Sequence, residues 1–180
     1  MNLSQDQIVA TACTILNTYG LADVSMRRIA ANLGVQPSAL YWHFASKQAL
    51  LDAIAAVILA DLPAFSGGDL TRVRLWAARF HALLSKYRDG AELVWSALTC
   101  KDWQAGIGYQ LEQGLIEAGV SPQRAHGAAT GILNLVLGQA FDDDQRRQAA
   151  RLGVNPTPVG APTADTLDDA VGLLVAGLAA

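Results

Sequence analysis

A glycine between two short amphipathic segments constrains the fold of this chain more than any other feature. Ser25 can cap a helix whose inner positions end at Leu33, and Gly34 can stop that helix. Pro37 lies three residues later, where the first turn of a helix tolerates proline, so a second short helix begins almost at once. Two helices joined by so tight a turn are typical of a helix-turn-helix unit.

Three large side chains, Tyr41, Trp42 and His43, are consecutive in this second helix. Because successive helical positions are about 100° apart, one face cannot bury all three. Leu40 and Phe44 are four residues apart and should form the inner face, so we expect the cluster to point partly to water. Such exposure has a reason if the helix enters the major groove of DNA. The alternative is a plain helical hairpin whose aromatic side chains pack on neighbouring helices.

The rest of the chain is also predicted to be helical. Ser4 and Gln7 can form a capping box at the start of a first helix that Gly20 ends, and Ser46 can cap a helix that extends to Pro63. Further helices are expected over residues 70–90, 91–100, 103–119, 121–151 and 167–178, with a proline- and glycine-rich loop before the last one. No segment predicts a strand, so the expected fold class is all-α.

Composition and charge favour a globular protein of the cytoplasm. Hydrophobic residues make up 52% of the chain and charged residues 16%. No apolar run is long enough to span a membrane and no basic residue precedes the first apolar segment, so we expect a soluble protein with no membrane partner. Cys13 and Cys100 have no metal-like spacing and are expected to be buried thiols.

The charges are unevenly distributed. Residues 1–50 contain three basic and two acidic residues, whereas the remaining 130 contain ten basic and fourteen acidic residues. If the protein binds nucleic acid, the N-terminal part is therefore the place for it.

No enzyme class is indicated. The histidines His43, His81 and His126 are dispersed, and no Cys/His or Ser/His/Asp spacing is recognisable. No glycine-rich phosphate loop follows a strand. We therefore predict no catalytic residue, no metal and no cofactor. A helical interaction module without sequence-specific DNA binding is the alternative to a DNA-binding protein.

The segment SMRRIAANLGVQPSALYWHFASKQALLDAI resembles the DNA-binding domain of the TetR family of bacterial repressors, and the similarity covers residues 4 to about 60. YRDGAEL and ILNLVLGQAFDDDQ resemble the regulatory domain of tetracycline repressors. The resemblance implies a three-helix DNA-binding head over residues 1–46 and a helical ligand-binding and dimerisation body over residues 47–180. It also implies a homodimeric repressor that binds a palindromic double-stranded operator and is released by a small-molecule effector.

Two arguments select the DNA-binding residues. The basic side chains of Arg27, Arg28 and Lys47 bracket the exposed helix and could neutralise phosphates, while Ala39 offers an apolar contact to a thymine methyl group. The resemblance carries family contacts onto Ser25, Arg27, Gln36, Ser38, Ala39, Tyr41, His43 and Lys47, and the complete predicted set adds Arg28, Pro37 and Trp42.

The predicted effector site is less well defined. Each candidate could equally belong to the core, and His81 could be an ordinary surface histidine. Matching to tetracycline repressors puts Pro63 and Val94 where those proteins use histidines, while Asp142 keeps the matched acidic position within a charged run. We therefore expect a flat apolar or aromatic effector and not a magnesium–tetracycline chelate. The candidates are Trp76, Phe80, His81, Trp95, Trp103, Tyr109, Gln110 and Asn134.

The helix after Ser121 predicts a dimer. It is apolar nearly all round, with Ile132 and Leu135 among the expected contacts, and Gly127, Gly131 and Gly138 would permit close helix approach. Together with the closing helix, it offers more apolar surface than one small domain can bury. The alternative is a fully buried central helix in a monomer.

Overall fold

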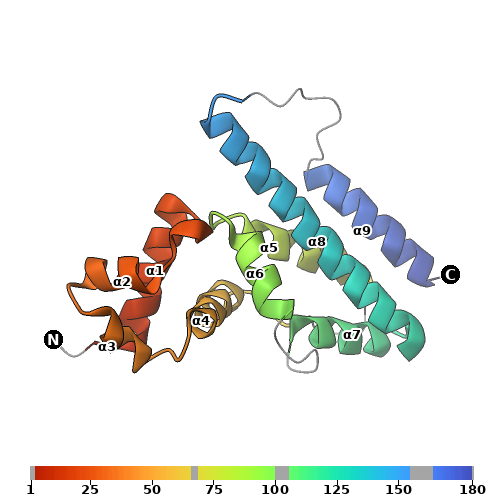
Figure 1. The fold of residues 1–180 in the computed structure, drawn as a ribbon. Coiled ribbons are helices and arrows are strands. Elements are labelled where there is room, and N and C mark those ends of the chain that lie inside the picture. Colours follow the sequence, from red (N-terminus) through yellow and green to blue (C-terminus); the bar gives the residue numbers. More distant parts are fainter. Residues whose placement is uncertain (1–2, 66–68, 100–105, 155–163, 180) are drawn as a thin grey trace.

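A computed structural model describes residues 3–65, 69–99, 106–154 and 164–179. Within these residues the chain is helical and contains no strand, so the predicted all-α class is confirmed (Figure 1). The helices are α1 (Gln5–Tyr19), η1 (Leu21–Asp23, a 3-10 turn), α2 (Met26–Leu33), α3 (Pro37–Tyr41), α4 (Lys47–Leu59), α5 (Arg72–Leu84), α6 (Gly90–Thr99), α7 (Ile107–Glu117), α8 (Pro122–Arg151) and α9 (Ala164–Ala179).

Side-chain caps start the N-terminal helices where the sequence predicts them. The Ser4 hydroxyl accepts a hydrogen bond from the Gln7 main-chain N–H at 3.2 Å, and the Gln7 side chain accepts one from the Ser4 N–H at 3.1 Å. The Ser25 hydroxyl accepts from the Arg28 N–H at 3.2 Å, and Ser46 caps α4 in the same way. Each cap satisfies a donor that has no partner inside its own helix.

The turn between α2 and α3 depends on the backbone angle of Gly34. Its φ is 67°, in the left-handed region, and the Val35 N–H donates to the Ala30 carbonyl at 3.0 Å to close the helix end. No atom lies within 4 Å of the place where a Cβ would be, so the angle and not the available space favours glycine. Pro37 then opens α3 after only two residues.

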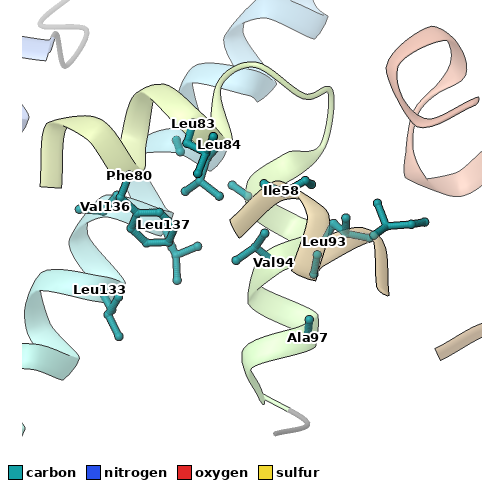
Figure 2. Close-up of a cluster of buried hydrophobic side chains, with 14 of the residues drawn as sticks. Ile58, Phe80, Leu83, Leu84, Leu93, Val94, Ala97, Leu133, Val136 and Leu137 are labelled. Atoms are coloured by element: carbon teal, nitrogen blue, oxygen red, sulfur yellow. The ribbon is translucent and has the colours of Figure 1, made fainter. Parts of the chain in front are cut away.

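Helix α4 connects the N-terminal helices to the rest of the molecule. It packs on α1 and on α6, with Leu50 and Ile54 fully buried. Figure 2 shows Ile58, near its end, beside Leu93 of α6. The helix ends at Leu59, earlier than predicted. Pro63 has no N–H to donate to the Leu59 carbonyl and disfavours the helical conformation at Leu62. The Leu62 N–H donates to the Leu59 carbonyl instead, at 3.0 Å, in a tighter turn.

The larger body is built around the long helix α8, which contacts α5, α6, α7 and α9. Phe80, Leu93 and Val136 have no exposed surface and belong to one continuous core (Figure 2). Helix α9 lies beside α8 (Figure 1) and is joined to α5 by an ion pair between Arg74 and Asp168. No helix among the described segments is both long enough and apolar enough to cross a membrane.

One expectation about α8 is wrong. Ile132 was expected at a dimer contact, but it has no exposed surface and lies in the core of the protomer. The other helices of the body cover this face of α8, while Gly127, Asn134, Gly138 and Phe141 point to solvent. Periodicity identified an apolar helix but could not tell which neighbour covers each face.

Candidate nucleic-acid interface and effector region

The helix-turn-helix unit separates buried from exposed aromatic residues. Leu40 has no exposed surface and Phe44 is 7% exposed, whereas Tyr41 is 54% and Trp42 90% exposed. Leu40 and Phe44 therefore hold α3 against the neighbouring helices and leave Tyr41 and Trp42 in water. The main-chain carbonyl of His43 accepts a hydrogen bond from the Gln5 side chain at 3.0 Å, which ties the end of this unit to α1.

The other predicted DNA-binding residues flank this exposed pair along the chain. Arg27, Gln36, Ser38 and Lys47 are exposed, whereas Pro37, Ala39 and His43 are half-buried. Ser25 already uses its hydroxyl as the cap of α2. Arg27 and Lys47 stand in the first turns of α2 and α4, where main-chain N–H groups and the helix dipole also favour phosphate.

Arg28 has a different environment from Arg27. Its guanidinium forms an ion pair with Asp23 and lies 3.8 Å from the centre of the Tyr19 ring. These contacts join the start of α2 to the end of α1 and to η1. The group is therefore already engaged within the N-terminal unit, which the sequence did not indicate.

Two predicted effector-site residues form part of a packed aromatic cluster. The ring centres of Trp76 and Phe80 are 5.4 Å apart, and Phe65 meets Trp76 edge-on at 6.5 Å. The Trp76 indole N–H donates to the Pro63 carbonyl at 3.0 Å. Phe80 is completely buried and belongs to the core, whereas Trp76 also borders a small pocket of about 150 Å³ beside Phe65.

The remaining candidates are dispersed. The His81 Nε2 lies 2.9 Å from a carboxylate oxygen of Asp143, which holds His81 between α5 and α8. Tyr109, Gln110 and Asn134 are exposed on α7 and α8. Trp103 lies outside the described residues. Among the residues that it describes, the structure therefore does not bring the predicted effector residues together in one cavity.

A groove between α6 and α8 is lined by another candidate, Trp95. The volume of this groove is about 350 Å³. Phe141, the second aromatic residue of this groove, was not among the predicted residues. Its position directly before the charged run 142–144 was the only hint in the sequence that this large apolar side chain lies near the surface. The lining residues are Ala91, Glu92, Trp95 and Ser96 of α6 and Leu137, Gly138 and Phe141 of α8.

A polar junction, also missed, connects the N-terminal helices to α8. Asp89 accepts hydrogen bonds from the Leu21 main-chain N–H and from the Gln148 side chain, both at 2.6 Å. The Asp89 N–H donates to a carboxylate oxygen of Asp144 at 3.2 Å. A Cβ at position 20 would lie 2.7 Å from the Asp89 carboxylate, so Gly20, at φ 97°, permits this close approach.

The buried carboxylate of this junction is electrostatically stabilised. Burial alone would raise the pKa of Asp144, but hydrogen bonds from Gln148, the Asp89 N–H and Arg147 outweigh it and lower the pKa below the usual 3.8. In the part of the chain that the structure describes, no group of three His, Cys, Asp or Glu side chains could hold a metal ion.

Comparisons with known proteins identify the family. Residues 8–54 match the model of bacterial regulatory proteins, tetR family. The chain is also 32% identical over 179 residues to the class A tetracycline repressor from transposon 1721 of Escherichia coli, with 93% of this chain and 82% of that repressor covered. The chain belongs to the TetR family. The resemblance seen in the sequence is thus confirmed.

Other TetR-family proteins are similar over different lengths. BioQ, solved with its natural double-stranded DNA operator, is 33% identical with a TM-score of 0.80, and 99% of each chain is covered. A TetR variant from Acinetobacter baumannii AYE in complex with minocycline is 26% identical with a TM-score of 0.78, covering 97% of this chain and 92% of that one. The matches to the class C, D and H tetracycline repressors span only 44% of the length of those proteins.

Proposed function

We propose that this TetR-family chain is a homodimeric, DNA-binding transcriptional repressor that binds a palindromic operator and is released by a small apolar or aromatic effector. The observation that carries the proposal is the separation of Leu40 and Phe44, which are buried, from Tyr41 and Trp42, which are exposed. A short helix with this arrangement, directly after a glycine turn, presents side chains of the kind that contact base edges and phosphates. The similarity to operator-bound BioQ supports it.

The proposed interface uses all three helix starts of this region. We assign it Ser25, Arg27, Gln36, Pro37, Ser38, Ala39, Tyr41, Trp42, His43 and Lys47. Arg28, the remaining predicted residue, supports this interface from within the fold through its ion pair with Asp23. We place the head in residues 1–46 and the effector-binding and dimerisation body in residues 47–180. Arg27 and Lys47 supply charge for the backbone, while α3 supplies the groups for base edges.

The proposed dimer uses the exposed faces of α8 and α9. Leu173 is 76% and Leu174 40% exposed in the protomer, which is unusual for leucines on a helix next to a large core. On α8, nothing lies within 4 Å of the Cβ positions of Gly127 and Gly131, so a second copy can approach the backbone closely. In a dimer with two-fold symmetry, this same face of each protomer would contact the corresponding face of its partner.

The proposed effector class follows from the chemistry of the matched positions. Val94 is completely buried and offers only hydrocarbon, and the Pro63 carbonyl is occupied by the Trp76 indole. A magnesium–drug chelate needs oxygen or nitrogen ligands, which these two side chains do not provide. An apolar or aromatic molecule is therefore the better candidate, and magnesium-tetracycline should not release DNA.

The test is binding to DNA from the region upstream of the coding sequence, measured by fluorescence anisotropy over a series of salt concentrations. Tyr41→Ala and Lys47→Ala should weaken binding, and Lys47→Ala should lower the slope of log K against log salt by about one unit. Lys86→Ala, an exposed lysine in the body, is the matched control and should change neither. A folded dimer that binds no upstream DNA would favour the alternative, a helical interaction module.

A further inference from the structure

Helix α5 and the turn after it form an unusually basic segment of an acidic chain. Residues 70–88 contain five of the 13 lysines and arginines and no aspartate or glutamate, whereas the whole chain has a net charge of −3. Two of these five side chains are used inside the protomer, because Arg74 pairs with Asp168 and Arg88 donates to the Thr18 carbonyl at 3.2 Å. The other three are exposed to solvent.

Arg72 and Arg79 lie on the same outer face of α5. They are seven residues apart, which is nearly two turns, so they point in directions within about 20° of each other and are about 10 Å apart along the helix axis. Leu75 lies between them and is 54% exposed. The acid nearest in sequence, Asp69, accepts hydrogen bonds from Thr71, and these lower the pKa of Asp69 more than the charge of Arg72 does. Among the described side chains, no carboxylate forms an ion pair with Arg79.

The small pocket beside Trp76 is lined by both of these arginines. Phe65 and Trp76 contribute its aromatic lining, and no acidic residue lines it. The Trp76 N–H is already used by the Pro63 carbonyl, so Arg72 and Arg79 are its remaining side-chain donors. A space of about 150 Å³ holds one group of the size of a benzene ring and is smaller than the roughly 300 Å³ at which small-molecule sites begin. The pocket therefore fits one side chain of a partner better than it fits a small-molecule effector.

We propose that this face of α5 is a docking surface for an acidic segment of another protein, which places one apolar side chain in the pocket and carboxylates on Arg72 and Arg79. The planar guanidinium of arginine pairs well with carboxylates, through two parallel hydrogen bonds. Residues three positions apart in an extended peptide span about 10 Å, which equals the rise between Arg72 and Arg79. Two acids three positions apart with an apolar residue between them therefore match the face.

The charge and the pocket together select a peptide as the partner. A phosphate backbone would match the two arginines, but it offers no apolar side chain for the space beside Phe65 and Trp76. A pocket that takes one apolar side chain and is bordered by polar groups is typical of the energetically dominant centre of a protein–protein interface. The inference goes beyond the proposed function, and binding at α5 does not depend on operator binding.

Binding is tested by fluorescence anisotropy with the full-length protein and three labelled hexapeptides, EELSEE, EEGSEE and KKLSKK. The wild-type protein should bind EELSEE, should bind EEGSEE about tenfold more weakly because the apolar side chain is missing, and should not bind KKLSKK. Arg79→Ala should weaken the binding of EELSEE by about tenfold. Arg151→Ala, which removes the same charge from an exposed position at the end of α8, is the matched control and should leave binding unchanged.

A substitution that fills the pocket without changing the charge completes the test. Ala64 is exposed and lines the pocket, so Ala64→Phe should occupy it and reduce the affinity for EELSEE to that for EEGSEE. Equal binding of the two acidic peptides by the wild-type protein, undiminished binding by Arg79→Ala, or no binding of any peptide would overturn the proposal. Phosphatidylglycerol vesicles that bind the wild-type protein but not Arg79→Ala would overturn it in favour of a membrane. A change of oligomeric state in Arg79→Ala, measured by sedimentation velocity, would overturn it by showing that a second copy covers this face.

Discussion

Arg27 and Arg28 are adjacent in α2, but their side chains have different surroundings. Arg27 is exposed and has no described acidic side chain within ion-pair distance. Arg28 is paired with Asp23 and lies over the Tyr19 ring. Because successive residues of a helix point about 100° apart, one of two neighbouring arginines can hold the fold while the other faces a ligand.

We expect Arg28→Gln to reduce the free energy of unfolding by about 1 kcal/mol, the sum of a partly exposed ion pair and a cation–π contact. Arg27→Gln should leave the free energy of unfolding unchanged. It should lower the slope of log K for operator binding against log salt by about one unit, as the loss of one phosphate contact would. Urea unfolding and anisotropy titrations at several KCl concentrations measure the two effects. A reduced salt slope in Arg28→Gln would show that Arg28 leaves Asp23 to contact a phosphate.

Among the elements, the connection between the N-terminal helices and α8 is polar and specific. Asp89, between α5 and α6, has φ 55°, which is unusual for a residue other than glycine. A backbone angle of this kind costs roughly 1–3 kcal/mol and persists where the surroundings hold it in place. Here the contacts to Leu21, Asp144 and Gln148 do so.

The Asp144 carboxylate should make stability depend on pH. Its pKa in the folded protein lies below the usual 3.8, so its stabilisation is present above about pH 4 and is lost as the pH falls towards the folded value. Asp144→Asn should reduce the free energy of unfolding at pH 7 by roughly 1–3 kcal/mol, because it weakens hydrogen bonds to a buried charge. The variant should also lose less stability between pH 6 and pH 3, as measured by urea unfolding.

Asp168 provides the comparison for Asp144. Its pKa is also lowered, by the hydrogen bond from Arg74, but this pair between α5 and α9 is exposed to solvent. Asp168→Asn should therefore affect stability less than Asp144→Asn does. An equal or larger loss for Asp168→Asn would show that the buried junction is not the stronger connection.

For the molecule as a whole, the exposed apolar surface of α9 is the feature that a single protomer does not explain. Leu173 is exposed although the helix is fixed on its other side by Leu167 and Val171, which are buried. Since the protomer already satisfies its own core, the exposed leucines are available for a second copy. A two-fold arrangement would also set the spacing of the two heads on DNA, about 34–36 Å for successive major grooves.

Leu173→Glu should leave the protomer folded and dissociate the dimer, because an unpaired charge buried at the interface costs roughly 3–5 kcal/mol. Operator affinity should fall with it, since each head would then bind alone. Sedimentation velocity measures the oligomeric state. Leu75→Glu on α5, at a leucine that is 54% exposed, is the control and should remain dimeric. A dimer in both variants would place the interface elsewhere.

The sequence alone was sufficient for the features that depend on neighbouring residues. The Ser4 capping box, the Ser25 and Ser46 caps, the Gly34 turn and the opening of α3 by Pro37 were all predicted and are present. These interactions join residues within about four positions of each other, so residue type and spacing determine them. The family could be recognised for the same reason, because its motif lies in one continuous segment.

Only the tertiary structure decided which helix covers which face. It placed Ile132 in the core, filled the space around Phe80, brought Trp95 beside Phe141, and joined Asp89 to Leu21 across 68 positions of the chain. An apolar stripe shows that a face must be covered but not whether the cover is another helix, a ligand or a second protomer. That choice depends on packing between segments far apart in sequence, which helical periodicity does not encode.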